Sequence, residues 1–177
     1  MAKVRLYIAQ SLDGFIANLD GGIGWLDRFN QESGEDYGYK AFYGQIGTLL
    51  MGGNTYAQVL GFAPEYVHSD RRTLVFTSRP LPVHLGVELV TGDPVPVVRA
   101  QKAQADQDLW LVGGGQLVRT LHQAKLIDEL ILSLIPVTLG AGIPLFAGLA
   151  QETFWTLAQT QSFQSGIVQL VYRPLYP

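Results

Sequence analysis

Short apolar runs alternate with helical patterns along most of the chain. Residues 3–10 place Val4, Leu6 and Ile8 on one face, a period of two that predicts a β-strand. Similar apolar runs predict strands at residues 48–51, 73–77, 87–90, 108–112 and 129–137. The end of the chain predicts a hairpin of two strands, 153–163 and 167–173, which turns near Ser165-Gly166.

Helix signals lie between these strands. Asp93 followed by Pro94 has the form of an N-cap with proline at the first helical position, and opens a helix to about Ala105. Apolar spacing or glycine turns predict further helices at residues 35–45, 55–60 and 116–123, whereas residues 11–25 read as a loop. Strands interleaved with helices predict one α/β domain over residues 1–177, with parallel strand pairs and a C-terminal antiparallel hairpin.

Composition narrows the class of protein. The 177 residues are 47% hydrophobic, which excludes a disordered chain and allows one well-buried core. The absence of cysteine excludes disulfides, thiol catalysis and Cys-based metal sites, and fits a cytoplasmic protein. A net charge of −3 argues against a nucleic-acid partner, which would require a basic face.

Charged residues are scarce, at 15% of the chain against roughly 25% in an average soluble domain. Residues 130–150 carry no formal charge and are long enough to cross a bilayer. Pro136, Pro144 and three glycines interrupt this stretch, so a buried strand that continues into a Gly/Pro loop is favoured over a membrane span. The scarcity of charge suggests that a partner subunit covers part of the surface.

Two segments repeat the order of buried strand, glycine turn and helix start. They end in Gly52-Gly53-Asn54-Thr55 and in Gly113-Gly114-Gly115-Gln116. Glycines let the backbone approach a ligand closely, and the helix start directs unpaired N–H groups toward an anion. A pair of such turns suits a dinucleotide pyrophosphate, although glycines that only serve tight turns are the plainer alternative.

Other polar residues add less. Ser78-Arg79 follows a predicted strand and offers a hydroxyl and a guanidinium to a phosphate. His68, His84 and His122 show no metal-binding spacing and read as surface or loop residues. The pattern therefore favours metal-free chemistry carried by a cofactor over hydrolysis.

Four motifs in order resemble the dihydrofolate-reductase-like superfamily, and within it the stand-alone proteins similar to the C-terminal reductase domain of bifunctional riboflavin-biosynthesis enzymes. They lie at residues 6–17, 50–56, 112–115 and 136–146, and include Leu12-Asp13-Gly14-Phe15 and Val112-Gly113-Gly114-Gly115. The resemblance implies an eight-stranded, mostly parallel sheet with flanking helices. It also implies a homodimer and a bound nicotinamide dinucleotide, usually NADPH.

The resemblance assigns residues to this cofactor. Those matched to cofactor binding are Ile16, Ala17, Gly52, Gly53, Asn54, Thr55, Ser78, Arg79, Gly113, Gly114, Gly115, Gln116 and Leu117. In relatives the Gly113-Gly114 pair often contains a cis peptide, and an arginine occupies the position of Gly53. Losing that guanidinium removes a charged contact to phosphate, so NADH is also considered as the cofactor.

The residue that handles the proton is a second question. Counting back from Gly52, the acidic position of the folate enzymes falls on Asp36, whose carboxylate would orient the heterocycle and raise the basicity of its nitrogen. The alternative is that Asp36 merely complements a helix start. Further residues expected around the substrate are Ala9, Asp13, Trp25 and Tyr39, of which Asp13 is equally explained as a turn residue.

These features predict an NAD(P)H-dependent reductase of a small heterocyclic substrate, pterin-like or aminopyrimidine-like. By resemblance the activity is that of a dihydrofolate reductase or a 5-amino-6-(5-phosphoribosylamino)uracil reductase. Residues 11–35 contain no lysine and a single arginine, Arg28, which offers little to a phosphorylated sugar. The alternative is a dinucleotide-binding homodimer without turnover. Either protein is expected to dimerise near residues 136–146 and the C-terminal hairpin.

Overall fold

The computed structural model describes residues 1–32 and 35–176, with side chains described outside residues 30–34. Its strands are β1 (Val4–Ser11), β2 (Phe15–Ala17), β3 (Ile46–Gly52), β4 (Arg72–Phe76), β5 (Val87–Val90), β6 (Asp108–Gly113), β7 (Glu129–Ile135), β8 (Ile143–Pro144), β9 (Phe154–Ser162) and β10 (Val168–Leu175). Its helices are the 3-10 turn η1 (Gly24–Leu26), α1 (Asp27–Glu32), α2 (Tyr39–Tyr43), α3 (Gly53–Val59), α4 (Pro94–Gln104) and α5 (Gly115–Gln123).

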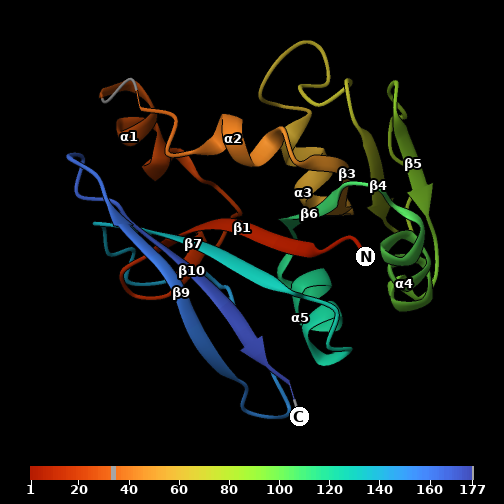
Figure 1. Ribbon diagram of the computed structural model, residues 1–177. Helices are drawn as coiled ribbons and strands as arrows, with labels where there is room; N and C mark the ends of the chain where they lie inside the picture. The colour runs from red at the N-terminus through yellow and green to blue at the C-terminus, as the bar shows by residue number, and fades with distance from the viewer. Residues whose placement is uncertain (33–34, 177) are drawn as a thin grey trace.

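Eight strands form one twisted sheet in the order β5-β4-β3-β6-β1-β7-β10-β9 (Figure 1). The first six strands in this order pair in parallel, and β10 and β9 add two antiparallel strands at one edge. The expected α/β fold, with its mostly parallel sheet and C-terminal hairpin, is confirmed. Because the parallel strands end at the same edge, the loops that follow β1, β3, β4 and β6 meet there.

Hydrophobic side chains cover both faces of the sheet. On one face α4 and α5 bury Val98, Leu117 and Leu121 against strand residues such as Leu6 and Leu111. On the other face α2 and α3 pack Phe42, Tyr56 and Val59 against β3 and β6. Figure 1 shows the same layering, with α1, α2 and α3 on one side and α4 and α5 on the other. A sheet covered on both faces explains why its central strands read as continuous apolar runs.

Local signals at α4 and β7 are confirmed. The Asp93 carboxylate accepts a hydrogen bond of 2.9 Å from the backbone N–H of Val95, and Pro94 opens the helix as expected. The uncharged stretch at residues 130–150 begins as strand β7 and continues into loops and the short β8. None of the helices in the described part of the chain is long and apolar enough for a membrane crossing.

Several expectations are corrected. The helix predicted at residues 35–45 begins only at Tyr39, because Gly38 adopts a left-handed φ of 78° and ends a turn before it. The expected loop at residues 11–25 contains strand β2 and the start of the turn η1, and α1 follows it. His122, expected at the surface, is buried and bonds Thr153 at 3.1 Å.

Candidate active site

A cleft of about 1540 Å³ opens where the parallel strands end. Its walls come from β1, the loop and strand at residues 16–26, α3, the loop after β4, the start of α5 and β8. The expected site residues that line this cleft are Ala9, Ile16, Ala17, Gly52, Gly53, Asn54, Thr55, Ser78, Arg79, Gly113, Gly114, Gly115, Gln116 and Leu117. Asp13, Trp25, Asp36 and Tyr39 lie outside its lining.

The two glycine turns contact each other at the centre of the cleft. A Cβ on Gly114 would lie 3.3 Å from Cα of Gly52 and 3.4 Å from Oγ1 of Thr55. Gly114 has a φ of +101°, a conformation that side chains with a Cβ rarely adopt. The Gly113–Gly114 peptide is trans, which differs from the cis peptide that the resemblance implied. The second turn therefore needs glycine for its conformation, and the backbones of the two turns approach each other closely.

Helix α5 begins directly from the second turn. The backbone N–H of Val118 bonds the carbonyl of Gly114 at 2.9 Å, so the earlier N–H groups of the helix have no acceptor within it. Gly115, Gln116 and Leu117 supply these groups, and all three line the cleft. Nine residues of aligned peptide dipoles add a partial positive charge at this end. The arrangement can hold an anion against the backbone.

The absence of arginine at position 53 has a steric explanation. A Cβ on Gly53 would lie 2.8 Å from Oγ1 and 3.0 Å from Cβ of Thr77. Thr77 is fixed in place because its hydroxyl bonds both the backbone N–H and the carbonyl of Arg79 at 3.2 Å. The space that an arginine side chain would enter from residue 53 is thus filled by Thr77.

Arg79 extends into the same end of the cleft from the loop after β4. Its Nη2 donates to Oδ1 of Asn54 at 2.7 Å, which links this loop to the start of α3. Ser78 lines the cleft beside it. Arg119 on α5 also lines the cleft, and its Nη1 lies 3.1 Å from where a Cβ on Gly148 would be. The sequence offered no signal for Arg119, because its position one turn into a helix has no motif. We call this region, residues 52–55, 76–79 and 113–120, the phosphate end.

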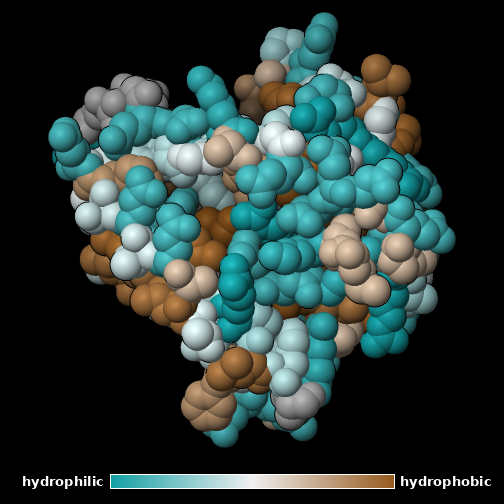
Figure 2. Space-filling model, viewed as in Figure 1, coloured by the Kyte–Doolittle hydropathy of each residue, from teal (hydrophilic) through white to brown (hydrophobic). Residues whose placement is uncertain are grey.

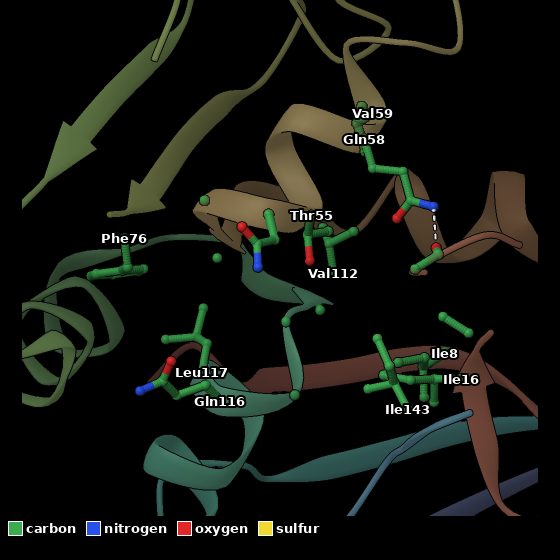
Figure 3. A pocket seen from close by; sticks show the side chains of 18 of the residues that line it. Ile8, Ile16, Thr55, Gln58, Val59, Phe76, Val112, Gln116, Leu117 and Ile143 are labelled. Atoms are coloured by element: carbon green, nitrogen blue, oxygen red, sulfur yellow. Dashed lines mark hydrogen bonds between the residues drawn. The ribbon is translucent and has the colours of Figure 1, made fainter. Parts of the chain in front are cut away.

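The other end of the cleft is mainly apolar. Figure 3 shows Ile8, Ile16 and Ile143 close together on the wall that leads to it, opposite Gln58 and Val59 of α3. The amide of Gln58 donates to the carbonyl of Gly21 at 2.8 Å and ties the loop at residues 19–23 to α3. Sequence reasoning missed Gln58, since a helix residue that bonds a distant loop carries no local pattern. We call residues 7, 19–23, 26, 58–59 and 62 the distal end.

Strands β2 and β8 close one wall of the cleft between these two ends. Phe15 pairs with Pro144 and Ala17 with Ile143, which brings the expected residues Ile16 and Ala17 to the wall. Asp13 secures this contact. Its carboxylate accepts hydrogen bonds from the Ser11 hydroxyl at 2.6 Å and from the Gly140 N–H at 2.7 Å. These bonds hold the pKa of Asp13 below its usual value. In this structure Asp13 joins two loops.

Asp36 lies at the start of α2. Its carboxylate accepts backbone hydrogen bonds from Gly38 at 3.1 Å and Lys40 at 3.2 Å, and these bonds keep its pKa below the ordinary value. It is close enough to Tyr7, which lines the cleft, for its charge to add to the rise that burial causes in the pKa of Tyr7. Asp36 is therefore an ionised, exposed group outside the cleft lining, with its charge acting on Tyr7 of that lining.

Two further expected residues sit near Asp36 or the distal end. Tyr39 packs in an aromatic cluster, with its ring centroid 5.5 Å from that of Tyr43 and 5.8 Å from that of Trp110. Trp25 lies in η1, beside Leu26 of the distal end, and its buried Nε1 has no hydrogen-bond partner among the described residues. Both are half-buried wall residues behind the lining.

Comparisons with known proteins identify relatives. The sequence matches the family model of the RibD C-terminal domain over residues 2–169. The uncharacterized protein YwjB of Bacillus subtilis (strain 168) is 39% identical over 171 residues, which are 96% of this chain and 97% of that protein.

Solved structures share the fold. A "putative riboflavin biosynthesis protein" from Shewanella sp. PV-4 superposes with a TM-score of 0.86 at 28% identity, covering 99% of this chain and all of that one. Dihydrofolate reductase from Enterococcus faecalis, complexed with NADP(H) and RAB-propyl, superposes with a TM-score of 0.69. It is 20% identical, and the match covers 97% of this chain and 96% of the reductase, so it supports the fold alone.

Proposed function

The chain belongs to the RibD C-terminal domain family, and from this premise we propose that it is an NAD(P)H-dependent reductase of a small heterocyclic substrate. The observation that carries the proposal is the contact between the two glycine turns at the phosphate end. It brings the backbone N–H groups at the start of α5 and the guanidinium of Arg79, which bonds Asn54, to one part of the cleft at the carboxyl ends of parallel strands. This is where open α/β sheets bind nucleotides.

The described residues fit a nicotinamide dinucleotide. The turn at Gly52 and the first residues of α5 would hold the pyrophosphate, because glycine leaves room for it and the helix start favours anions. Ser78 and Arg79 would hold the ribose side, with or without a 2′-phosphate. Ile16 and Ala17 would lie over the nicotinamide. When bound, the cofactor supplies a hydride for the substrate carbon.

The chain itself would orient the substrate and place the proton. Ile8, Ala9 and Ile16 form an apolar wall that keeps water from the hydride acceptor. Asp36 is ionised at neutral pH, so its proposed part is electrostatic: a carboxylate outside the cleft lining favours protonation of the substrate nitrogen rather than donating the proton itself. This role of Asp36 stays a prediction.

The experiment that tests the proposed function has two steps. Isothermal titration with NADPH and NADH measures whether the protein binds a nicotinamide dinucleotide at all. Loss of absorbance at 340 nm with pterins and aminopyrimidines then measures turnover. Absence of binding by both cofactors contradicts the reductase, and binding without turnover of any ring substrate supports the alternative described below.

Replacing Asp36 with asparagine is expected to lower kcat by about 100-fold while the affinity for NADPH stays unchanged. Gly38 and Lys40 donate to different oxygens of the carboxylate, and the amide of asparagine keeps only one of them, so the change removes the charge and one of the two bonds at the start of α2. Steady-state kinetics and titration measure the two effects. Asp70→Asn is the matched control, because it also removes one carboxylate close to α2: Asp70 accepts a hydrogen bond from Tyr43, which packs against Tyr39. Unchanged kcat in Asp36→Asn would remove Asp36 from the mechanism.

Arg79 is expected to read the 2′-phosphate. In Arg79→Ala, we expect the Kd for NADPH to rise about tenfold and the Kd for NADH to change less than twofold, since NADH lacks the phosphate that a guanidinium would bind. Arg99→Ala, a change outside the cleft lining, serves as the control. Equal weakening of both cofactors would show that Arg79 only organises Asn54.

The alternative is a dinucleotide-binding homodimer that acts as a sensor or scaffold. It is favoured by one observation, namely that both oxygens of the Asp36 carboxylate already accept hydrogen bonds from backbone N–H groups.

Both proposed functions include a homodimer. The edge strand β9 exposes Phe154 and Leu157, and Figure 2 shows hydrophobic residues toward the hairpin side of the molecule. A cytoplasmic location, with its NAD(P)H pool, completes the proposal.

A further inference from the structure

The charges that line the cleft are unevenly distributed. Among the described residues of the lining, the cations are Arg79 and Arg119, and both belong to the phosphate end. The distal end carries a single charged side chain, Asp20, whose carboxylate accepts a hydrogen bond of 2.8 Å from Gly22. Any group bound at the distal end would therefore meet a carboxylate and no cation.

An anionic substrate would bind poorly at such a surface. A phosphate or carboxylate that leaves water needs charged or multiple hydrogen-bond partners, and its transfer without them is strongly unfavourable. Asp20 adds repulsion. The cations at the other end do not help, because the proposed cofactor would already use them for its own phosphates. A phosphorylated sugar or a glutamate tail thus meets no cationic side chain among the described lining residues of the distal end.

Hydrophobic side chains stand at the rim of the distal end. Leu19 is 76% exposed and Phe62 is 56% exposed, and they come from the loop before Asp20 and from the residues after α3. Large apolar residues exposed together at the rim of a cleft are typical of a surface that an apolar ligand can cover. With Ile23, Leu26 and Val59 they form a lining suited to an uncharged ring.

We propose that the distal end of the cleft selects an uncharged, unphosphorylated ring compound as the substrate, and discriminates against phosphorylated or carboxylated analogues. This inference rests on the proposed function, since it takes the phosphate end as the place of the nicotinamide dinucleotide. It narrows that function to a substrate class different from the phosphoribosyl compound that the family resemblance implied. The discrimination follows from the position of two arginines and one aspartate.

Two matched pairs of probes test the proposal on protein saturated with NADP⁺. One pair is a ribosylaminopyrimidine and its 5′-phosphate, and the other is 6-methylpterin and folate, which carries the glutamate tail. Calorimetric titration is expected to give a Kd at least tenfold lower for the uncharged member of each pair. An anionic member that binds as tightly as its partner overturns the inference, and so does failure of both uncharged probes to bind.

A positive charge added at the rim tests whether electrostatics causes the discrimination against anionic substrates. Phe62→Lys places an ammonium group at the distal end and is expected to reduce the discrimination in the first pair at least threefold. Leu85→Lys is the matched control, because Leu85 is 80% exposed and lies outside the cleft lining. Equal discrimination in both variants contradicts the electrostatic cause. NADP⁺ binding by the unmodified protein is measured beforehand. If that protein does not bind NADP⁺, the result contradicts the proposed function.

Discussion

A Gly114→Ala variant is expected to bind NADPH at least about 100-fold more weakly than the unmodified protein. Residue 114 has a φ of +101°, and holding alanine there costs about 1–3 kcal/mol. The added Cβ would also lie 3.3 Å from Cα and 3.4 Å from N of Gly52. These are backbone atoms that cannot rotate away, so the two turns must separate. Since 1.4 kcal/mol is a tenfold change in Kd, strain and separation together account for the loss.

Calorimetric titration measures this loss of NADPH affinity. The Gly38→Ala control separates the effect of backbone strain from that of crowding by the added Cβ. Gly38 has a similar left-handed φ of 78°, but nothing lies within 4 Å of the Cβ it would carry and it does not line the cleft. That variant is expected to lose some stability and keep its affinity for NADPH. An unchanged affinity in Gly114→Ala would show that the contact between the turns does not form the cofactor site.

Gly142→Ala is expected to lower turnover by at least about tenfold while the Kd for NADPH rises much less. A Cβ on Gly142 would overlap the carbonyl oxygen of Ala17 and lie 3.0 Å from the side chain of Phe15. Strand β2 must then move away from β8, which shifts the wall that carries Ile16. A displaced reacting group of even 1 Å can cost 100-fold in rate, whereas the phosphate end is untouched.

Steady-state kinetics with the best ring substrate measures this effect, and Gly140→Ala is the control from the same loop. Gly140 has a φ of +75°, and its Cβ would meet nothing within 4 Å. We expect a loss of stability in the control without a selective loss of kcat. Equal kinetics for the two variants would mean that the pairing of β2 with β8 does not position the wall.

Local chemistry explains which elements could be predicted from the sequence. The helix at Asp93-Pro94 and the two glycine turns each depend on residues within one short segment, so their patterns are visible. The pairing of Phe15 with Pro144 joins residues far apart in the chain, and strands β2 and β8 are too short for periodicity. The late start of α2 at Tyr39 depends on the left-handed Gly38, which a helical spacing of aromatics conceals.

The candidate site also has one part that sequence patterns predict and one part that they do not. The phosphate end could be predicted because its contacts come from backbone turns that glycine patterns mark. The distal end could not, because its character follows from where Leu19, Gln58 and Phe62 meet in space. The position of Asp36 was expected near the site, but its bonds to Gly38 and Lys40 depend on the turn before α2.

The close approach of Gly53 to Thr77 affects which amino-acid substitutions these two positions can accept. A Cβ at residue 53 would lie 2.8 Å from Oγ1 of Thr77, so an arginine entering first would meet an occupied space. Alanine at position 77 removes the 2.8 Å overlap with Oγ1 but keeps the 3.0 Å contact with Cβ, and it loses the hydroxyl bonds to Arg79. We therefore expect the two positions to be epistatic: an arginine at position 53 should cost less stability when residue 77 has already lost its hydroxyl.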